Sequence, residues 1–157
     1  MNAHQSIVDV LNGVAIYADL RQWEQLQALY ADEVAVDYTS LVGGAPGQVK
    51  ADELIASWQT GLGRYRATQH LLGNHRVRIS GDQAQALVYV QATHWLPQPD
   101  GDSTWTVHGY YDYTLTQMGD AWCITRHMFT ATIVHGARTL LEMQGVKAEW
   151  LTTSSNG

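Results

Sequence analysis

The chain of 157 residues has little of several features that define whole classes of protein. Its single cysteine, Cys123, excludes an internal disulfide bond and any metal site built from several cysteines. Nine lysines and arginines stand against fifteen aspartates and glutamates, and the net charge of −6 argues against a nucleic-acid partner. No apolar run approaches the ~18 residues of a membrane-spanning helix. We therefore expect a protein that binds neither nucleic acid nor membrane.

Phenylalanine is also scarce, with one residue against six tryptophans and eight tyrosines. Trp and Tyr combine an apolar body with a polar tip, which suits a cavity that holds a flat, partly polar small molecule. An ordinary position at the boundary of the core is the alternative interpretation, and it accounts for most of these side chains. The aromatic composition therefore favours a small-molecule partner without proving one.

The length suits one domain, which we place at residues 1–150, and residues 151–157 are expected to be a disordered tail. The first twelve residues show no basic segment followed by an apolar block, so no secretory signal is expected. Cytoplasmic residence is the default expectation.

Hydrophobic periodicity changes from helical in the first half of the chain to period-two in the second half. The pattern predicts helices over residues 6–18, 21–30 and 51–61, a short strand over 34–38, a glycine-rich loop over 41–48 and a last helix within 136–146. Long strands are predicted over residues 68–80, 84–96, 103–117 and 121–134. Short turns between consecutive strands indicate an antiparallel meander, and helices followed by such a sheet define an α+β fold.

A strongly bent sheet wrapped against the long first helix would form a cone with one open end. Period-two reading places His94 at the end of a small apolar strand face and Tyr111 on the inner face of the next strand. His70 opens the first long strand, and Gly73 is a candidate β-bulge that would switch the faces after it. Asp19 ends the first helix and could orient a histidine in the cavity.

Histidines on an apolar face must be satisfied there or do chemistry, because an unpartnered buried polar group costs ~1–3 kcal/mol. His70 could be bonded to a backbone carbonyl, and Asp19 could be a capping or solvated carboxylate. His94 could only cover the rim of the cavity, and Tyr38 could be an ordinary half-buried strand tyrosine. For each residue taken alone, the sequence does not decide between this structural role and a catalytic one.

The order of these residues resembles the SnoaL-like branch of the nuclear-transport-factor-two-like superfamily, and within it the scytalone dehydratases. The resemblance covers residues 5–135 and rests on the following residues in order: Asp19, Trp23, Val36-Asp37-Tyr38, Thr68-Gln69-His70, His94 and Gly119-Asp120-Ala121-Trp122. It implies a cone-shaped α+β fold, a cystatin-like barrel in which a curved antiparallel sheet packs on N-terminal helices. The family includes dehydratases, isomerases, polyketide cyclases and dehydrohalogenases.

The resemblance also implies roles for four residues. His70 matches the catalytic histidine, Asp19 the aspartate that supports it, Tyr38 a tyrosine that polarises the substrate carbonyl through water, and His94 a second histidine of the pocket. The chain departs from the pattern at Ala18, where the dehydratase has a tyrosine, and at Tyr111, where it has an asparagine. The substrate-binding residues that we predict are Tyr17, Trp58, Tyr111 and Arg126.

Arg126 is predicted to share a strand face with Trp122 and Ile124, where it could clamp a ligand carboxylate, although an ordinary ion pair is the simpler alternative. A metal site is not expected, since His70 and His75 fall on opposite strand faces without a bulge and no H-x-x-x-H helix motif occurs.

The leading hypothesis is a cofactor-independent dehydratase (a lyase) that removes water from a small cyclic or polyketide-like hydroxy ketone. A neutral histidine suits the removal of a proton next to a carbonyl, and an aspartate would fix its tautomer. Isomerisation, cyclisation or dehydrohalogenation by the same pair, and a non-catalytic binding or interaction domain, are the alternatives. A homo-oligomer is expected, because the outer faces of such sheets often pair.

Overall fold

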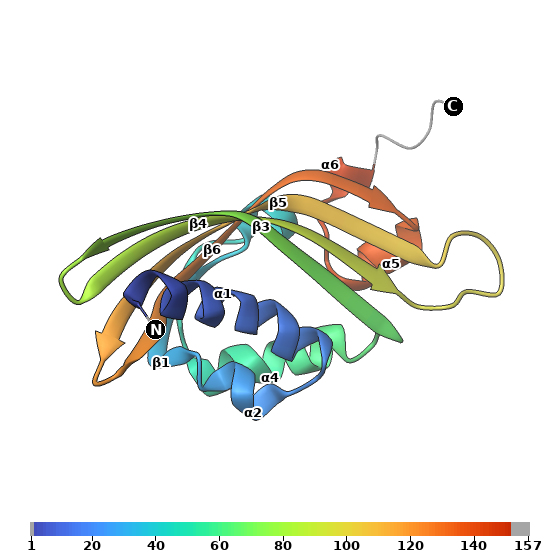
Figure 1. Cartoon of the computed structure of the whole chain (residues 1–157). Coiled ribbons are helices and arrows are strands. Elements are labelled where there is room, and N and C mark those ends of the chain that lie inside the picture. Colours follow the sequence, from blue (N-terminus) through green and yellow to red (C-terminus); the bar gives the residue numbers. More distant parts are fainter. Residues whose placement is uncertain (1, 152–157) are drawn as a thin grey trace.

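The computed structural model describes residues 2–151 and is built around one six-stranded sheet with the strand order β2-β1-β6-β5-β4-β3 (Figure 1). Five neighbouring pairs form the sheet, and four of them are antiparallel, while β1 runs parallel to β6. The strands are β1 (Tyr30–Asp37), β2 (Gly47–Lys50), β3 (Ala67–Ser80), β4 (Gln83–Trp95), β5 (Thr104–Met118) and β6 (Ala121–Gly136). The predicted α+β class and the predicted meander of four long strands are confirmed.

Three helices, α1 (Ala3–Asp19), α2 (Trp23–Gln27) and α4 (Ala51–Leu62), lie together on one side of the sheet (Figure 1). Helix α1 begins where the Asn2 side chain accepts a hydrogen bond from the backbone of Gln5 at 2.9 Å. One stripe of α1 is buried in the core and packs mainly toward β3. Its buried apolar members recur at helical spacing: Ile7, Leu11, Val14 and Ala18.

The sequence prediction was wrong in the segment between α1 and α4. The predicted helix over residues 21–30 shortens to α2, because β1 already begins at Tyr30 and pairs with β6. The predicted loop over residues 41–48 contains the end of α3 (Thr39–Val42) and the start of β2, an edge strand that pairs only with β1. Gly43 and Gly44 have φ angles of +76° and +80°, which turn the chain between these two short elements. Pairing partners distant in sequence decide both outcomes.

Three β-bulges reverse which residues face the core, one in β3 and two in β6. One of those in β6 leaves Thr132 as an additional residue, because Ala131 pairs with Gly109 and Ile133 with His108. In β3 the register shifts between Gly73 and Arg76, and Asn74 has a φ angle of +55°, so the bulge predicted at this point is confirmed. In β6 the register shifts between Ile124 and Arg126, which leaves Thr125 as the additional residue. One added residue moves every later side chain to the opposite face.

The C-terminal segment folds back on the sheet through α5 (Arg138–Met143) and α6 (Ala148–Leu151). Leu151, which the sequence analysis assigned to the disordered tail, ends α6 and is buried, so the prediction was wrong at this residue. The rest of the predicted tail, residues 152–157, lies outside the described residues. No helix among residues 2–151 is long and apolar enough to cross a membrane.

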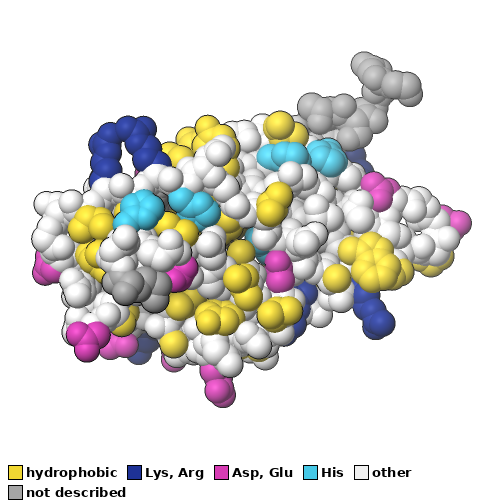
Figure 2. All heavy atoms as spheres, viewed as in Figure 1, with side chains coloured by type: hydrophobic (Ala, Val, Ile, Leu, Met, Phe, Trp, Pro, Cys, Tyr) yellow, Lys and Arg dark blue, Asp and Glu magenta, His cyan; other side chains and the backbone are white. Residues whose placement is uncertain are grey.

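Charged side chains are scattered over the face of the molecule that Figure 2 shows. On the face shown in Figure 2, the Lys and Arg side chains of the described residues lie apart from one another and form no continuous basic stripe. Acidic side chains are distributed around the same face. A nucleic-acid backbone would require a basic stripe, and this face does not offer one.

Candidate active site

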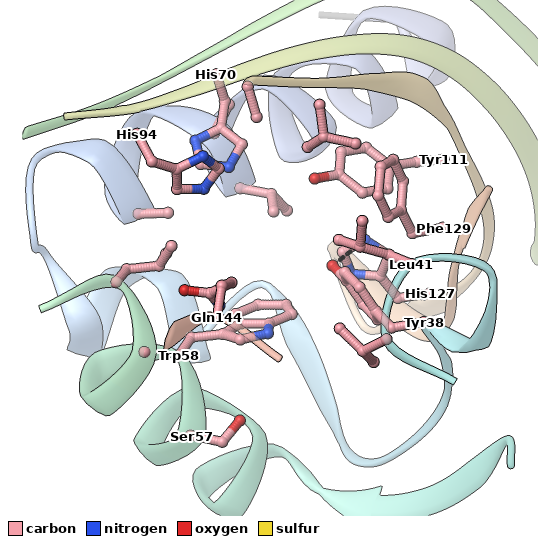
Figure 3. Close-up of a pocket in the computed structure, with 18 of the residues that line it drawn as sticks. Tyr38, Leu41, Ser57, Trp58, His70, His94, Tyr111, His127, Phe129 and Gln144 are labelled. Atoms are coloured by element: carbon pink, nitrogen blue, oxygen red, sulfur yellow. Dashed lines mark hydrogen bonds between the residues drawn. The ribbon is translucent and has the colours of Figure 1, made fainter. Parts of the chain in front are cut away.

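A cavity of about 310 Å³ lies between α1, α4 and the inner face of the sheet (Figure 3). Most of its wall is aliphatic or aromatic, and none of its lining residues is an aspartate, glutamate, lysine or arginine. His70 and His94 stand at one end and Tyr38, Tyr111 and His127 at the other, while Ser57 and Gln144 add polar groups to the wall near Trp58 (Figure 3). Such a chamber suits a small uncharged molecule with an apolar body.

An aspartate–histidine pair forms the first polar end. The Nδ1 atom of His70 lies 2.7 Å from Oδ1 of Asp19, and the exposed fractions of the two side chains are 12% and 17%. Because an ionised carboxylate only accepts hydrogen bonds, Nδ1 carries the hydrogen and donates it to Asp19. In the neutral form of the ring, the lone pair is therefore on Nε2, the nitrogen not used by Asp19.

The end of α1 places Asp19 beside β3. The backbone N–H of Gln22 donates to the carbonyl of Tyr17 at 2.8 Å, and that of Arg21 donates to Ala18 at 3.2 Å. These two bonds form a Schellman motif, in which the residue after the helix cap takes a left-handed conformation. Arg21 occupies this position with a φ angle of +59°. The helix thus stops at Asp19 and presents its carboxylate to the first residues of β3.

Two further groups hold the carboxylate in place. The hydroxyl group of Thr68 donates to Oδ1 of Asp19 at 2.9 Å, and the backbone N–H of His70 donates to Oδ2 at 2.7 Å. Arg21 in turn donates to the Thr68 oxygen at 2.9 Å and to the backbone carbonyl of Leu62 at 2.9 Å. The pair is therefore fixed by α1, β3 and the end of α4 together.

The electrostatics of Asp19 favour its ionised form. Burial alone would raise the pKa of this carboxyl group, but the hydrogen bonds and the charge of His70, together with the Thr68 hydroxyl group, lower the pKa below its ordinary value. The pKa of Arg21 is lowered by burial, although Asp19 opposes this shift. Asp19 is thus a permanent acceptor for the Nδ1 hydrogen of His70 at neutral pH.

His94 lies beside His70 and is almost completely buried. Its ring stacks on the indole of Trp105 with 3.9 Å between centroids and 4° between planes, and its centroid lies 5.9 Å from that of His70. Burial, reinforced by the nearby His70, lowers the pKa of His94 to about 3. At neutral pH His94 is therefore an uncharged imidazole, which can hold a water molecule or a ligand hydroxyl group but does not supply an imidazolium proton.

The opposite polar end is built from aromatic hydroxyl groups around a second buried histidine. Nδ1 of His127 lies 3.0 Å from the Tyr30 oxygen, and Nε2 lies 3.2 Å from the Tyr38 oxygen. Burial lowers the pKa of His127 to about 3 and raises the pKa values of Tyr30, Tyr38 and Tyr111 above the ordinary value of a tyrosine. All of these groups are uncharged at neutral pH, and the Tyr111 hydroxyl group points into the cavity (Figure 3).

Most of the residues predicted from the sequence come together in this place. The structure places His70, His94, Tyr38, Trp58 and Tyr111 in the cavity wall, with Asp19 directly behind His70. The catalytic and binding roles of these residues stay predictions.

The structure places two predicted binding residues elsewhere. Tyr17, on α1, is not a cavity residue and instead packs beside Gly13 and Leu29. Arg126 forms an ion pair with Asp112 at 2.8 Å, with about 40% of each side chain exposed. The bulge at Thr125 explains the displacement of Arg126, since it moves this residue off the inner face.

Sequence reasoning missed His127, Thr68 and Arg21. The same bulge that turns Arg126 outward turns His127 inward, and the sequence around Thr125 contains no glycine or proline to indicate it. Thr68 was noted only as part of the Thr-Gln-His motif. Arg21 occupies a left-handed position that usually belongs to glycine. An arginine there gives no indication in the sequence that the helix ends. Among residues 2–151, no group of three or more His, Cys, Asp or Glu side chains could hold a metal ion.

The fold and the cavity define an α+β protein of the nuclear-transport-factor-two-like superfamily, with a buried polar pair at one end of an apolar chamber. Residues 1–128 match the model of the SnoaL-like domain, and the chain belongs to this family. No curated protein is similar enough to match the chain.

Solved structures share the fold over nearly the whole domain. The Kfla4162 protein of Kribbella flavida is 28% identical, with a TM-score of 0.84 over 88% of this chain and 96% of that chain. A protein of Novosphingobium aromaticivorans with the provisional name scytalone dehydratase is 18% identical, with a TM-score of 0.74 over 85% and 87%. The hexachlorocyclohexane dehydrochlorinase LinA-type3 of Novosphingobium barchaimii is 17% identical, with a TM-score of 0.69 over 87% and 90%. At these low identities the latter two show the shared fold alone.

Proposed function

We propose that the protein is a cofactor-independent lyase that removes water from a small, uncharged cyclic or polyketide-like hydroxy ketone. The observation that carries this proposal is the 2.7 Å contact between Nδ1 of His70 and Asp19 at the wall of the cavity. This contact leaves Nε2 of His70 as a base whose tautomer is fixed by a carboxylate.

The proposed reaction begins when Nε2 of His70 removes the proton from the carbon next to the substrate carbonyl. The electrons of that C–H bond form a carbon–carbon double bond as the C–O bond to the leaving hydroxyl group breaks. The imidazolium of His70, stabilised by the charge of Asp19, then returns the proton to the departing hydroxide, so water leaves and the base is regenerated. One histidine is thus sufficient for both proton transfers.

The far end of the cavity supplies the second requirement of this chemistry. Negative charge develops on the carbonyl oxygen as the proton leaves, and a hydrogen-bond donor at that oxygen lowers the barrier. Tyr38 and Tyr111 lie across the cavity from His70 (Figure 3). Burial raises the pKa of both phenols, so they keep their hydrogens and act as donors. Tyr38 is therefore assigned to the carbonyl oxygen, directly or through a water molecule.

Elimination of a halide by the same base is the second candidate. A halide leaves without a proton, and His94, whose pKa is lowered to about 3, offers no proton to a leaving group at neutral pH. One structural neighbour is named a hexachlorocyclohexane dehydrochlorinase and another carries the provisional name of a dehydratase. Both names are compatible with a base that opens an elimination.

The decisive experiment is a screen of hydroxy ketones and chlorinated rings for loss of water or chloride, with four proteins in parallel. We expect His70→Ala and Asp19→Asn to lower the rate by about 10²- to 10⁴-fold, the usual contribution of a general base. His135→Ala, a change of the same kind at an exposed residue outside the cavity, should keep the rate of the wild type.

Equal rates in all four proteins would remove His70 and Asp19 from the mechanism. Binding of the screened compounds without any turnover by the wild type would instead indicate a non-catalytic binding domain. Loss of chloride without loss of water would select the second candidate.

A further inference from the structure

A chain of three polar side chains extends from the core to the cavity at the end opposite His70. Tyr30 on β1 lies 3.0 Å from Nδ1 of His127, and Tyr38 lies 3.2 Å from Nε2 of the same ring. Tyr30 is buried and does not line the cavity, whereas Tyr38 and His127 do. The two ring nitrogens of His127 therefore connect a buried hydroxyl group with one that faces the ligand space (Figure 3).

The chemistry of an uncharged imidazole restricts this chain. The rings packed around His127 are those of tyrosines and of Trp58. Burial among them keeps His127 neutral, with its pKa lowered to about 3. A neutral ring has one N–H donor and one acceptor nitrogen. One of the two tyrosines must therefore donate to His127, and the other must accept from it.

Only one of the two arrangements satisfies Tyr30. No other hydrogen-bond partner of the Tyr30 hydroxyl group exists among residues 2–151, and the neighbouring Tyr113 hydroxyl group is itself buried without a partner. If Nδ1 carried the hydrogen, the hydroxyl hydrogen of Tyr30 would be a buried donor without an acceptor, which is costly. If Nε2 carries it, Tyr30 donates to Nδ1 and every hydrogen between Tyr30 and Tyr38 has an acceptor.

We propose that Tyr30 holds His127 in its Nε2–H tautomer and that His127 thereby makes Tyr38 a hydrogen-bond donor toward the cavity. Tyr30 and His127 are thus positioning residues. In this arrangement Nε2–H donates to the Tyr38 oxygen, and the Tyr38 hydrogen is directed to the cavity side, where the Tyr111 hydroxyl group and a ligand oxygen are its acceptors. The inference rests on the proposed function only in assigning this donor to the carbonyl oxygen of the substrate. It implies that the ligand presents an uncharged acceptor oxygen toward Tyr38.

The tautomer can be measured without any ligand. Nitrogen-15 NMR of the full chain labelled at its seven histidines separates protonated from unprotonated ring nitrogens, and a His127→Phe spectrum assigns the signals of residue 127. We expect Nε2 of His127 to be protonated and Nδ1 unprotonated from pH 5 to 8. Protonated Nδ1, or a ring that titrates in this range, would overturn the proposal.

The donor role is tested by binding of 2-tetralone, a bicyclic ketone, against tetralin, the matching hydrocarbon without oxygen. Quenching of tryptophan fluorescence reports both, because Trp58 and Trp105 line the cavity. The wild type should prefer the ketone, and we expect Tyr38→Phe and His127→Phe each to reduce this preference about three- to tenfold, the usual effect of losing one hydrogen bond.

Tyr113→Phe is the matched control. It removes a buried hydroxyl group that has no hydrogen-bond partner, in the same aromatic cluster and 4.5 Å from His127 between ring centroids. This variant should keep both the tautomer and the ketone preference. The donor role is overturned if His127→Phe keeps the full preference of the wild type for the ketone.

The outcome is independent of His70. The tautomer and the ketone preference are properties of the far end of the cavity, so they stand or fall without any turnover. Equal rates of the wild type and His70→Ala would contradict the proposed elimination. The tautomer of His127 and the preference for the ketone would be unchanged by that result. If 2-tetralone does not bind, the NMR experiment alone decides the proposal.

Discussion

At the scale of single residues, the neighbours of Asp19 set the ionised state and the direction of its carboxylate. Its two carboxylate oxygens accept hydrogen bonds from the ring and the backbone of His70 and from Thr68. Each bond favours the ionised carboxylate and fixes its direction. Thr68 is therefore a positioning residue for the pair, although it does not touch the cavity.

The Thr68→Val variant tests this role. Valine has nearly the same shape as threonine but no hydroxyl group, so one of the bonds that lower the pKa of Asp19 is lost. We expect the pKa of the Asp19 carboxyl group to rise in Thr68→Val and to stay unchanged in Thr68→Ser, as measured by carbon-13 NMR of the carboxyl group. An unchanged pKa in the valine variant would show that the Thr68 hydrogen bond is unimportant.

At the scale of elements, the end of α1 decides where the carboxylate stands. The Schellman motif requires a left-handed residue at position 21, and the chain uses an arginine there with a φ angle of +59°. The backbone strain is compensated by three hydrogen bonds from the Arg21 guanidinium to Ala18, Leu62 and Thr68. The side chain thus ties the end of α1 to α4 and β3.

Two substitutions separate these effects. Glycine adopts the left-handed conformation without steric cost, so Arg21→Gly should be about 1 kcal/mol more stable than Arg21→Ala in urea unfolding. Both variants lack the guanidinium group, and we expect both to lose activity to the same extent. Equal stability of the two variants would mean that the backbone at this position carries no strain.

At the scale of the whole molecule, two uncharged histidines are enclosed in the core. The pKa values of His94 and His127 are lowered from 6.5 to about 3, chiefly by burial. Below pH 6.5 the unfolded chain binds a proton at each of these residues, while the folded protein binds neither until about pH 3. Unfolding therefore takes up protons, and the free energy of unfolding falls as the pH is lowered through this range.

The predicted result is a loss of up to about 1.4 kcal/mol per pH unit for each of the two histidines between pH 6 and 4.5. Urea unfolding at several pH values measures it, and His127→Phe should reduce the slope by about half. Tyr113→Phe changes the same aromatic cluster without removing a histidine and should leave the slope unchanged. A free energy of unfolding that is constant over this range would contradict the burial of neutral histidines.

Period-two patterning was sufficient to predict much of the sheet. The four long strands, the inward face of β4 that ends in His94 and the inward position of Tyr111 follow from alternation along uninterrupted stretches of strand. Gly73 marked the bulge of β3 because glycine in a strand interior has few other reasons to be there. Asp19 was a candidate to orient a histidine in the cavity, but its pairing with His70 followed from the resemblance to a family, since no local pattern joins residues 19 and 70.

The sequence by itself determined the α+β class, the meander and the alternation of its strands, because these depend on the period of neighbouring residues. Only the tertiary structure decided the parallel pairing of β1 with β6, the edge strand β2 and the bulge at Thr125. Those features depend on partners distant in the chain, and one additional residue in β6 is enough to exchange Arg126 for His127 at the cavity wall. The geometry of both polar ends of the cavity belongs to this second group, since each is assembled from segments that meet only in the folded chain.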